Sequence, residues 1–515
     1  MIERLSLKFI WLLVPLFWTV TLLGVQFNQD VPKLNLFCGL ALLFFLNLTN
    51  INENKKGCFW LIIASLFIFS FFVSAHDYGV LIFALACGGI FLLSHTQSSS
   101  YITLLIIALG AFSNLSFVTN TNIQEVQYDF LSCYNYIEYI QENHLKFWQE
   151  NPILTRPGYS AYHPILHYLI AASIISGSKL IGASHIAANE AFQVVLVGYM
   201  LWYYVLSARI FELLKLPRAV MFALLSFICL FPSYNAIAGL INNDCLLLPL
   251  QAGTVYYALL YYLHGQKKNL FWIWLFMTAA CLTKLSGILT LPMVAVALLG
   301  RLIKEKKIKI FYDLCGFSVL LLLGISLWPL YQHYHLHINA DFVPPQEHLT
   351  LTPFSFWQRF SPLKAFIYEQ MFYDDYGPNF WETLTKTALF GQWTFAGRGI
   401  EIMTLIRFMI LGYKLINAMI IIAVIYLLCQ YKDKQILLII LSLLLALLGG
   451  LLAFSLKHPY MCNQDFRYIA ILPLSYALIF GLFIPQLPKI GQRFLISLLI
   501  GFGFLACFIW FWVSR

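Results

Sequence analysis

The chain has 515 residues, of which 60% are hydrophobic, 17% aromatic and only 11% charged, and its mean hydropathy is +0.77. Soluble domains carry about 25% charged residues. So few charges cannot cover a water-exposed surface, which excludes an ordinary soluble protein. The net charge of +9 does not indicate a nucleic-acid partner, because Lys and Arg concentrate in the cytoplasmic loops of membrane proteins. The composition therefore predicts an all-α polytopic membrane protein.

Apolar runs long enough to be membrane spans recur along the whole chain. A helix that crosses a bilayer needs about 20 mostly apolar residues. The runs lie at 9–25, 34–49, 58–75, 78–94, 101–118, 188–211, 219–241, 245–263, 270–283, 286–300, 310–331, 402–428, 435–456, 468–485 and 492–513. No small-residue cleavage site follows the first run, so we interpret it as a retained span and not a signal peptide. We expect about 14 to 15 transmembrane helices.

The placement of basic residues predicts the topology. Short cytoplasmic loops should hold the Lys and Arg, and an N-terminus inside the cell satisfies this rule. The basic loops are then those around residues 54–56, 215–218, 266–268, 301–309, 432–434 and 489–493. This alternation holds only if the apolar segment 163–181, interrupted by His167, Gly177 and Lys179, lies along the membrane surface. We predict a juxtamembrane helix there; the alternative is a further span.

Two long polar intervals fall on the non-cytoplasmic face under this topology, at 119–187 and 332–401. The first contains an amphipathic stretch, 129–143, with apolar residues at helical spacing, which predicts a helix at the interface. The second is rich in aromatics, prolines and histidines, including His333, His335 and His337. Loops of this length are usually functional or disordered, and this composition is too aromatic for disorder. We expect an ordered loop that covers a site.

Polar residues cluster at the same outer boundary of the predicted membrane domain. They comprise Asn242, Asn243, Asp244, Lys284 and the segment 457–467 with Asp465 and Arg467, together with Asp129, Tyr162 and His163. Ionisable residues near membrane spans cost free energy on insertion and are functional-site candidates. A carboxylate can remove a proton from an attacking hydroxyl, and fixed cations can stabilise a departing phosphate. The pattern favours nucleophilic substitution next to a lipid-borne phosphate that departs, because the charged head of such a lipid lies at this depth.

Five segments in chain order resemble the GT-C-type glycosyltransferases that use lipid-linked sugars, which include the protein O-mannosyltransferases and the lipid A aminoarabinose transferases (glycosyltransferase family 39 and relatives). Residues 129–143 resemble the first outer loop of that family, and 162–172 (YHPILHYLIAA) are similar to its "HPPLYYLLAA" segment. Residues 242–248 (NNDCLLL), 282–292 (LTKLSGILTLP) and 464–473 (QDFRYIAILP) resemble its "NNDALL", "LTKLSGLLLLP" and "RYxxPxLP" segments. The resemblance covers roughly 100–485 and implies a GT-C-type catalytic membrane domain there.

The resemblance implies transfer of a sugar from a polyprenyl-phosphate donor to a lipid, glycan or protein acceptor on the non-cytoplasmic face, with inversion. Asp129 would be the general base and Asp244 would orient the base or the acceptor. The substrate- and phosphate-binding candidates are Tyr162, His163, Arg156, Asn243, Lys284 and Arg467. The resemblance further implies domains at 1–99 (membrane helices of unknown role), 100–485 (catalytic) and 486–515 (a last helix). The short loops and the lack of appended domains favour a bacterial inner membrane as the location.

The chain departs from the family pattern beside the expected base. Phe130 stands where the family commonly has Glu, and Cys133 stands where a His often follows. A hard divalent cation needs several oxygen ligands, and only Asp129, with Glu125 as a possible substitute, is near. A metal is therefore not favoured, and no cofactor is expected. The alternating histidines of 333–337 have no fourth ligand placed beside them.

Each candidate residue also has a purely structural explanation. Asp129 is a good N-cap for the interfacial helix, and Asn242 to Asp244 suit a tight turn. Lys284 can extend its ammonium to the membrane surface. His163 precedes a proline, which favours an extended turn. Arg467 can pair with Asp465.

Three rival functions remain open from the sequence. A transporter or flippase of lipid-linked or amphipathic solutes would also have broken spans with polar residues near them. The clustering of polar residues at one face, instead of the bilayer midplane, argues against it. A polysaccharide polymerase or ligase would use the same donor, with Arg359 and Arg398 of the second outer loop at its site. The third is a non-catalytic descendant, because Phe130 replaces a catalytic Glu.

Overall fold

The computed structural model describes residues 99–120, 130–146, 148, 151, 160–180, 182–305, 308–339, 342–344, 349–363, 377–391 and 400–513. The long apolar segments form α5 (Ser99–Asn120), α9 (His185–Leu213), α10 (Arg218–Cys229), α11 (Pro232–Gly239), α12 (Asp244–His264), α13 (Lys268–Thr283), α14 (Leu291–Glu305), α15 (Ile308–Tyr331), α19 (Ile400–Gln430), α20 (Lys434–Lys457), α21 (Leu472–Phe483) and α22 (Lys489–Val513). Every apolar run from 101 onward is therefore helical, as predicted. The four runs before residue 95 lie outside the described residues.

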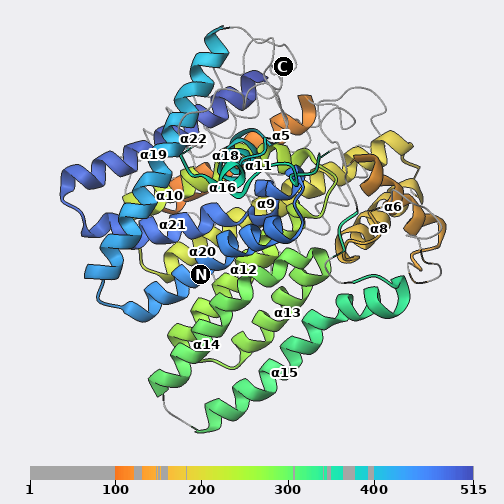
Figure 1. Cartoon of the computed structure of the whole chain (residues 1–515), viewed down its shortest axis with the longest axis horizontal. Coiled ribbons are helices and arrows are strands. Elements are labelled where there is room, and N and C mark those ends of the chain that lie inside the picture. The colour runs from red at the N-terminus through yellow and green to blue at the C-terminus, as the bar shows by residue number, and fades with distance from the viewer. Residues whose placement is uncertain are drawn as a thin grey trace, which may run out of the picture.

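The chain is an all-α integral membrane protein. Within the residues described, seven helices are long and apolar enough to cross a membrane, and up to nine if each of two bent helix pairs is one span. α5 and α13 are apolar but shorter, since the apolar part of α5 is Ile102–Val118 and α13 has 16 residues. The total of 14 to 15 spans stays a prediction. Figure 1 shows the helices gathered into one bundle with α6 and α8 beside each other at its edge.

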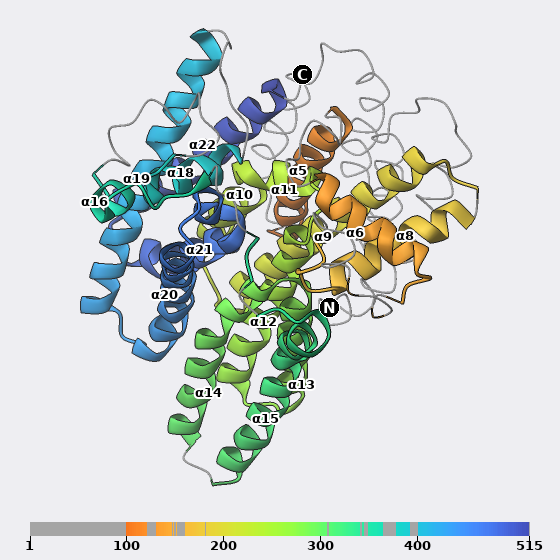
Figure 2. The ribbon, with the colours of Figure 1, turned by 45° about the vertical axis from the view of Figure 1, so that its right-hand side comes forward.

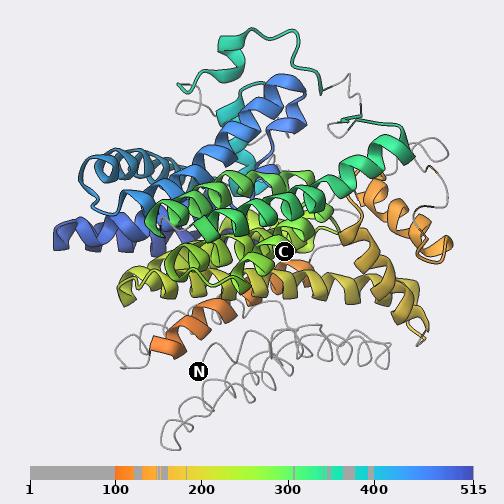
Figure 3. The ribbon, with the colours of Figure 1, turned by 90° about the horizontal axis from the view of Figure 1, so that it is seen from below.

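α12 lies at the centre of the part of the bundle that carries the candidate site. It packs against α9, α13 and α14, while α15 packs on α13 and α20 on α14. Figures 2 and 3 show α12 to α15 as a group of neighbouring helices with the C-terminal helices beside them. Leu248, Ala252 and Val255 of α12 are fully buried, as expected for a helix surrounded by other helices.

Two predicted spans are bent instead of straight. The run 219–241 divides into α10 and α11, which meet at 46°. Pro232, at the first turn of α11, has no N–H to donate to the preceding turn, and proline breaks a helix for that reason. The late run divides in the same way: the 3-10 helices η5 (Met461–Gln464) and η6 (Phe466–Ile469) meet α21 at 53°. Both predicted spans are therefore interrupted by a backbone turn.

Aromatic packing joins the two bends. The ring of Phe231, at the first bend, lies 5.5 Å from that of Phe466 in η6 and 5.2 Å from that of Tyr234. The Tyr234 hydroxyl donates to the carbonyl of Ala470 at 2.8 Å. Buried aromatic pairs contribute about 0.5 to 1.5 kcal/mol beyond their area burial, so this cluster fixes η6 against α11.

The first outer interval forms the two helices that were predicted for it. α6 (Phe130–Glu142) corresponds to the interfacial stretch and α8 (Leu166–Leu180) to the juxtamembrane segment. α8 has 15 residues, which is about 22 Å of helix and too short for a span. α6 packs against α8, and α8 against α9. The backbone N–H of Ser160 donates to the carbonyl of Ser132 at 3.2 Å, so the turn before α8 is attached to α6.

The second outer interval is ordered where it is described. It contains α16 (Phe356–Phe360) and α18 (Phe380–Phe390). Leu351 N–H donates to the carbonyl of Pro459 at 2.7 Å, and a guanidinium nitrogen of Arg359 donates to the carbonyl of Ser455 at 2.9 Å. This interval therefore lies against the outer end of α20 and the turn that follows it.

The packing of α8 against α6 and α9 can be tested through the pH dependence of stability, because α8 contains the buried His167. Its side chain is fully buried, and neither ring nitrogen has a hydrogen-bond partner within the described part of the chain. Burial lowers the pKa of His167 to about 3 from a usual 6.5. Between pH 6.5 and pH 3 the unfolded chain binds a proton on His167, whereas the folded chain does not. His167 therefore costs no stability above pH 6.5, and it destabilises the fold increasingly as the pH falls from 6.5 toward 3.

We expect that pH-dependent loss to be roughly 1 kcal/mol for each pH unit below 6.5. His167→Phe, which keeps a ring without a titratable group, should flatten that part of the stability profile. The measurement is thermal melting in detergent between pH 7 and pH 4. An equal slope in wild type and His167→Phe would show that His167 is not buried as a neutral ring.

Candidate outer-face charge site

Lys284 and Asp244 form a buried ion pair where α13 ends and the neighbouring helix α12 begins. α13 ends at Thr283, and Lys284 follows in an extended conformation, while α12 begins at Asp244. The Lys284 ammonium pairs with Oδ1 of Asp244. Lys284 is 7% exposed and Asp244 1% exposed. The Lys284 side chain is therefore buried in the protein and does not extend its ammonium to the membrane surface. The sequence prediction that these two positions converge is confirmed.

Side-chain amides hold the backbone on both sides of this ion pair. The Asn243 amide donates to the carbonyl of Thr283 at 3.0 Å, which joins the start of α12 to the end of α13. The Asn242 side-chain oxygen accepts from the Asp244 N–H at 3.0 Å. Asn243 is therefore structural here, and Asn242 to Asp244 do form the tight turn that the sequence offered as an alternative. The turn and the charge pair coexist.

Gly287 sets the shape of the turn that carries Lys284. It lies in the 3-10 helix η1 (Leu285–Thr290), and its N–H donates to the Lys284 carbonyl at 2.9 Å. A Cβ at this position would lie 2.6 Å from the carbonyl carbon of Ala280 and 2.8 Å from the nitrogen of Cys281. These are backbone atoms, so only glycine allows η1 to pack this closely on α13.

Gly287→Ala is expected to shift η1 away from α13 and to weaken the Lys284 to Asp244 pair. The cost should be about 1 to 3 kcal/mol, as for other overpacked sites. Gly501→Ala is the matched control, because a Cβ there meets nothing within 4 Å; it should be neutral or stabilising, since alanine favours helix over glycine. Melting temperatures of the two variants in detergent provide the comparison. Equal stability would contradict the close packing.

Tyr468 covers the Lys284 ammonium from the late outer segment. The ammonium lies 4.6 Å from the centroid of the Tyr468 ring, within the range of a cation–π contact. One residue earlier in the chain, Nε of Arg467 donates to the Asp465 carboxylate at 3.1 Å, and Asp465 is fully buried. The ion pair proposed as the structural role of Arg467 is therefore present. Tyr468 was not among the sequence candidates, although it lies inside the predicted segment 464–473.

Tyr162, in the first outer interval, contacts the beginning of the second outer interval. Its carbonyl accepts from the Gln332 amide at 3.0 Å, and its ring lies 6.0 Å from that of Phe342. The ring of His163 lies 4.3 Å from that of Tyr162, and the His163 N–H closes a turn onto the carbonyl of Ser160. The printed contacts thus join Tyr162 and His163 to the segment that follows α15, while Asp244, Lys284 and Tyr468 come together from three other parts of the chain.

Several buried polar atoms around these turns have no hydrogen-bond partner within the described residues. They are Nδ2 of Asn242, Oγ of Ser286, Oε1 of Gln332 and both amide atoms of Gln464. Buried polar groups are hydrogen-bonded in the great majority of cases. Gln464 is fully buried between Asn463 and Asp465. These atoms give the site unused donors and acceptors for a polar ligand.

α18 contributes buried charge that sequence reasoning missed. Glu382 and Lys386 are 3% and 2% exposed, and Glu382 interacts electrostatically with Lys414 of α19. The Thr387 hydroxyl accepts from the N–H of Phe466 at 2.9 Å, so α18 supports the turn that holds Asp465 and Arg467. The i, i+4 spacing of Glu382 and Lys386 in an otherwise apolar outer segment is the signal that could have identified them.

Three of the candidate residues lie outside the described residues: Asp129, Glu125 and Arg156. α6 begins at Phe130, directly after Asp129. Their roles stay predictions. Among the residues that the structure describes, no three His, Cys, Asp or Glu side chains gather in a way that could hold a metal ion.

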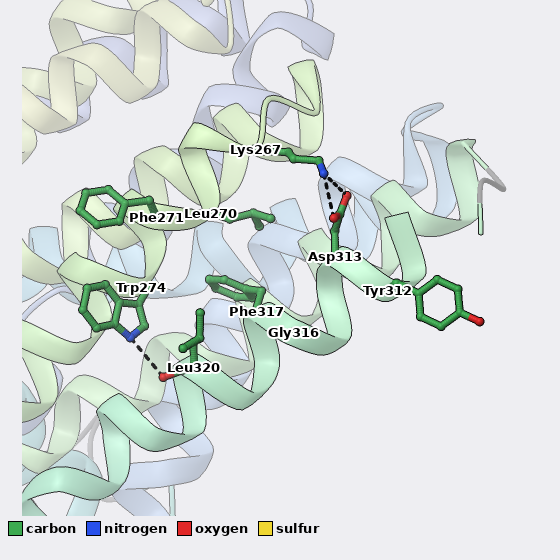
Figure 4. A pocket seen from close by; sticks show the side chains of 9 residues that line it. All are labelled: Lys267, Leu270, Phe271, Trp274, Tyr312, Asp313, Gly316, Phe317 and Leu320. Atoms are coloured by element: carbon green, nitrogen blue, oxygen red, sulfur yellow. Dashed lines mark hydrogen bonds and ion pairs between the residues drawn. The ribbon is translucent and has the colours of Figure 1, made fainter. Parts of the chain in front are cut away.

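A separate pocket lies at the other end of α13. It is lined by residues of α13 and α15 and begins beside Lys267 (Figure 4). The 16 residues of α13 separate Lys267 from Lys284, and the two caps are about 25 Å apart along the helix axis. This pocket is therefore not part of the charge site.

No protein-family model matches the chain, and no curated protein matches it at a significant level.

Proposed function

We propose that the protein is a membrane glycosyltransferase of the GT-C type, which moves a sugar from a polyprenyl-phosphate donor to an acceptor on the non-cytoplasmic face. The observation that carries the proposal is the buried pair of Lys284 and Asp244 under the Tyr468 ring at the outer helix ends. A buried charge pair costs desolvation energy, and its retention at a membrane boundary is typical of a functional site.

Lys284 has the chemistry to stabilise the leaving phosphate. An ammonium has three N–H donors, and Asp244 receives one of them. A second can point to a phosphate oxygen while Asp244 holds the side chain in place. Because the site excludes water, such a fixed charge stabilises a developing anion more strongly than it would in solution. Asp244 is thus a positioning residue in this proposal.

The reaction that we propose is a single inverting displacement. Asp129 removes the proton from an acceptor hydroxyl, and the hydroxyl oxygen forms a bond to the anomeric carbon of the sugar. The bond from that carbon to the donor phosphate breaks, and its electron pair leaves with the polyprenyl phosphate. In this proposal Tyr162 and the Gln464 amide contact the sugar or the phosphate. Arg467, paired with Asp465, shapes the outer turn.

The bends in two helices favour a second candidate, a transporter or flippase of lipid-linked solutes. Broken helices whose ends point at a ligand are a feature of transporters, and this chain has bends of 46° and 53°. The charge pair lies at helix ends and not at mid-helix, which favours the enzyme.

The test is turnover of radiolabelled polyprenyl-phosphate sugars by the full-length protein in lipid nanodiscs. Release or transfer of the sugar, reduced in Lys284→Met, would support the enzyme. The matched control is Lys457→Met at the end of α20, since Lys457 is an exposed cation near the same face. Donor movement across proteoliposomes without bond cleavage would support the transporter instead and would overturn the glycosyltransferase proposal.

A further inference from the structure

The pocket between α13 and α15 has the form of a lipid-chain groove. Its volume is about 540 Å³, within the usual range of ligand pockets. Its walls are apolar, with Leu270, Phe271 and Trp274 on α13 and Phe317 and Leu320 on α15 (Figure 4). Phe271 and Leu320 are more than half exposed. The Trp274 indole N–H donates to the Leu320 carbonyl at 3.1 Å and joins the two helices at the deeper end.

Gly316 leaves the middle of this groove open. It lines the pocket, and a Cβ added to it would meet nothing within 4 Å. The neighbouring turns of α15 carry bulky residues, so the absence of a side chain at Gly316 creates a channel along the helix surface. A channel of this kind accepts an extended hydrocarbon chain.

The polar end of the groove carries one cation and one anion. Lys267 Nζ lies 2.7 Å from Oδ2 and 2.8 Å from Oδ1 of Asp313. The two side chains are 61% and 27% exposed, so a ligand can reach both. The basic loops at 266–268 and 301–309 place this end on the cytoplasmic side.

The geometry points to a binding site for a phospholipid of the cytoplasmic leaflet whose headgroup carries both a phosphate and a primary ammonium, as in phosphatidylethanolamine. The phosphate binds Lys267 and the exposed Lys268, the ammonium binds Asp313, and one acyl chain follows the groove past Gly316. An anionic headgroup without an ammonium would be repelled by the Asp313 carboxylate. The inference is independent of the proposed function, since the groove lies at the other end of α13.

The test uses the full-length protein reconstituted with equal amounts of phosphatidylethanolamine and phosphatidylglycerol, and counts retained lipids by native mass spectrometry. Wild type should retain phosphatidylethanolamine preferentially. Gly316→Leu fills the channel while favouring helix and should weaken retention about tenfold, as expected when about two methylene groups lose burial. Gly449→Leu, at another exposed helix position with nothing within 4 Å, is the matched control and should retain the lipid.

Two headgroup variants separate a built site from general lipid contact. Lys267→Gln should weaken retention of both lipids about fivefold, the effect of one basic residue near a phosphate. Asp313→Asn should abolish the preference for phosphatidylethanolamine while leaving phosphatidylglycerol bound. Lys432→Gln, an exposed lysine of another cytoplasmic loop, is the control. Equal retention in Gly316→Leu and Gly449→Leu, or no preference in wild type, would overturn the proposal.

Discussion

Lys284→Met is expected to destabilise the protein by about 3 to 5 kcal/mol, because it leaves the carboxylate of Asp244 buried without its cation. Asp244 is 1% exposed, so water cannot replace the lost partner without opening the packing of α12 on α13. Methionine has nearly the length of lysine and fills the same space, which limits the effect to the charge. Unfolding by SDS in mixed micelles, followed by circular dichroism, measures the difference in free energy.

The double variant Lys284→Met, Asp244→Leu is the decisive control for that result. With both charges removed the desolvation cost disappears as well, and buried ion pairs replaced by apolar residues are often as stable as the original. We expect the double variant to return to within about 1 kcal/mol of wild type. It should nevertheless show no sugar turnover. Two single losses that simply add would mean that the two groups do not interact.

The apolar pattern predicted most of the fold. Runs such as 245–263 and 435–456 appear as α12 and α20 with boundaries within a few residues, because a continuous apolar stretch in lipid must satisfy its backbone internally and becomes a helix. The distribution of basic residues predicted that 163–181 is not a membrane span, and the structure has only the short helix α8 there.

What the pattern could not predict depends on contacts between distant segments. The bend at Phe231 and Pro232 follows from proline chemistry, but its direction is set by rings from α19, η6 and α22. The Lys284 to Asp244 pair joins positions 40 residues apart, and composition places both at one boundary without specifying that they touch. Tyr468 could not be identified for a related reason. The chain has 29 tyrosines, and only the contact of the Lys284 ammonium with the Tyr468 ring distinguishes this one from the others.

Asp129→Asn is expected to reduce sugar turnover by about 10² to 10⁴-fold, the usual contribution of a general base. The substitution separates the two explanations of Asp129. α6 begins at Phe130, so Asp129 immediately precedes a helix, and asparagine caps a helix about as well as aspartate. If the role is only capping, Asp129→Asn should leave both stability and turnover unchanged. If Asp129 is the base, stability stays and turnover falls, because an amide cannot take the proton.

Two further variants complete this experiment. Asp129→Ala removes both the cap and the base, and should lose about 1 kcal/mol of stability in addition to activity. Glu125→Gln tests whether this carboxylate takes the role of the Glu that GT-C-type enzymes commonly have where this chain has Phe130; if it does, turnover falls there as well, and the two carboxylates act together. Donor binding should persist in Asp129→Asn, because the proposed function assigns the donor phosphate to Lys284 and not to the base. Loss of binding in that variant would assign Asp129 to the donor site and leave the proton acceptor to another residue.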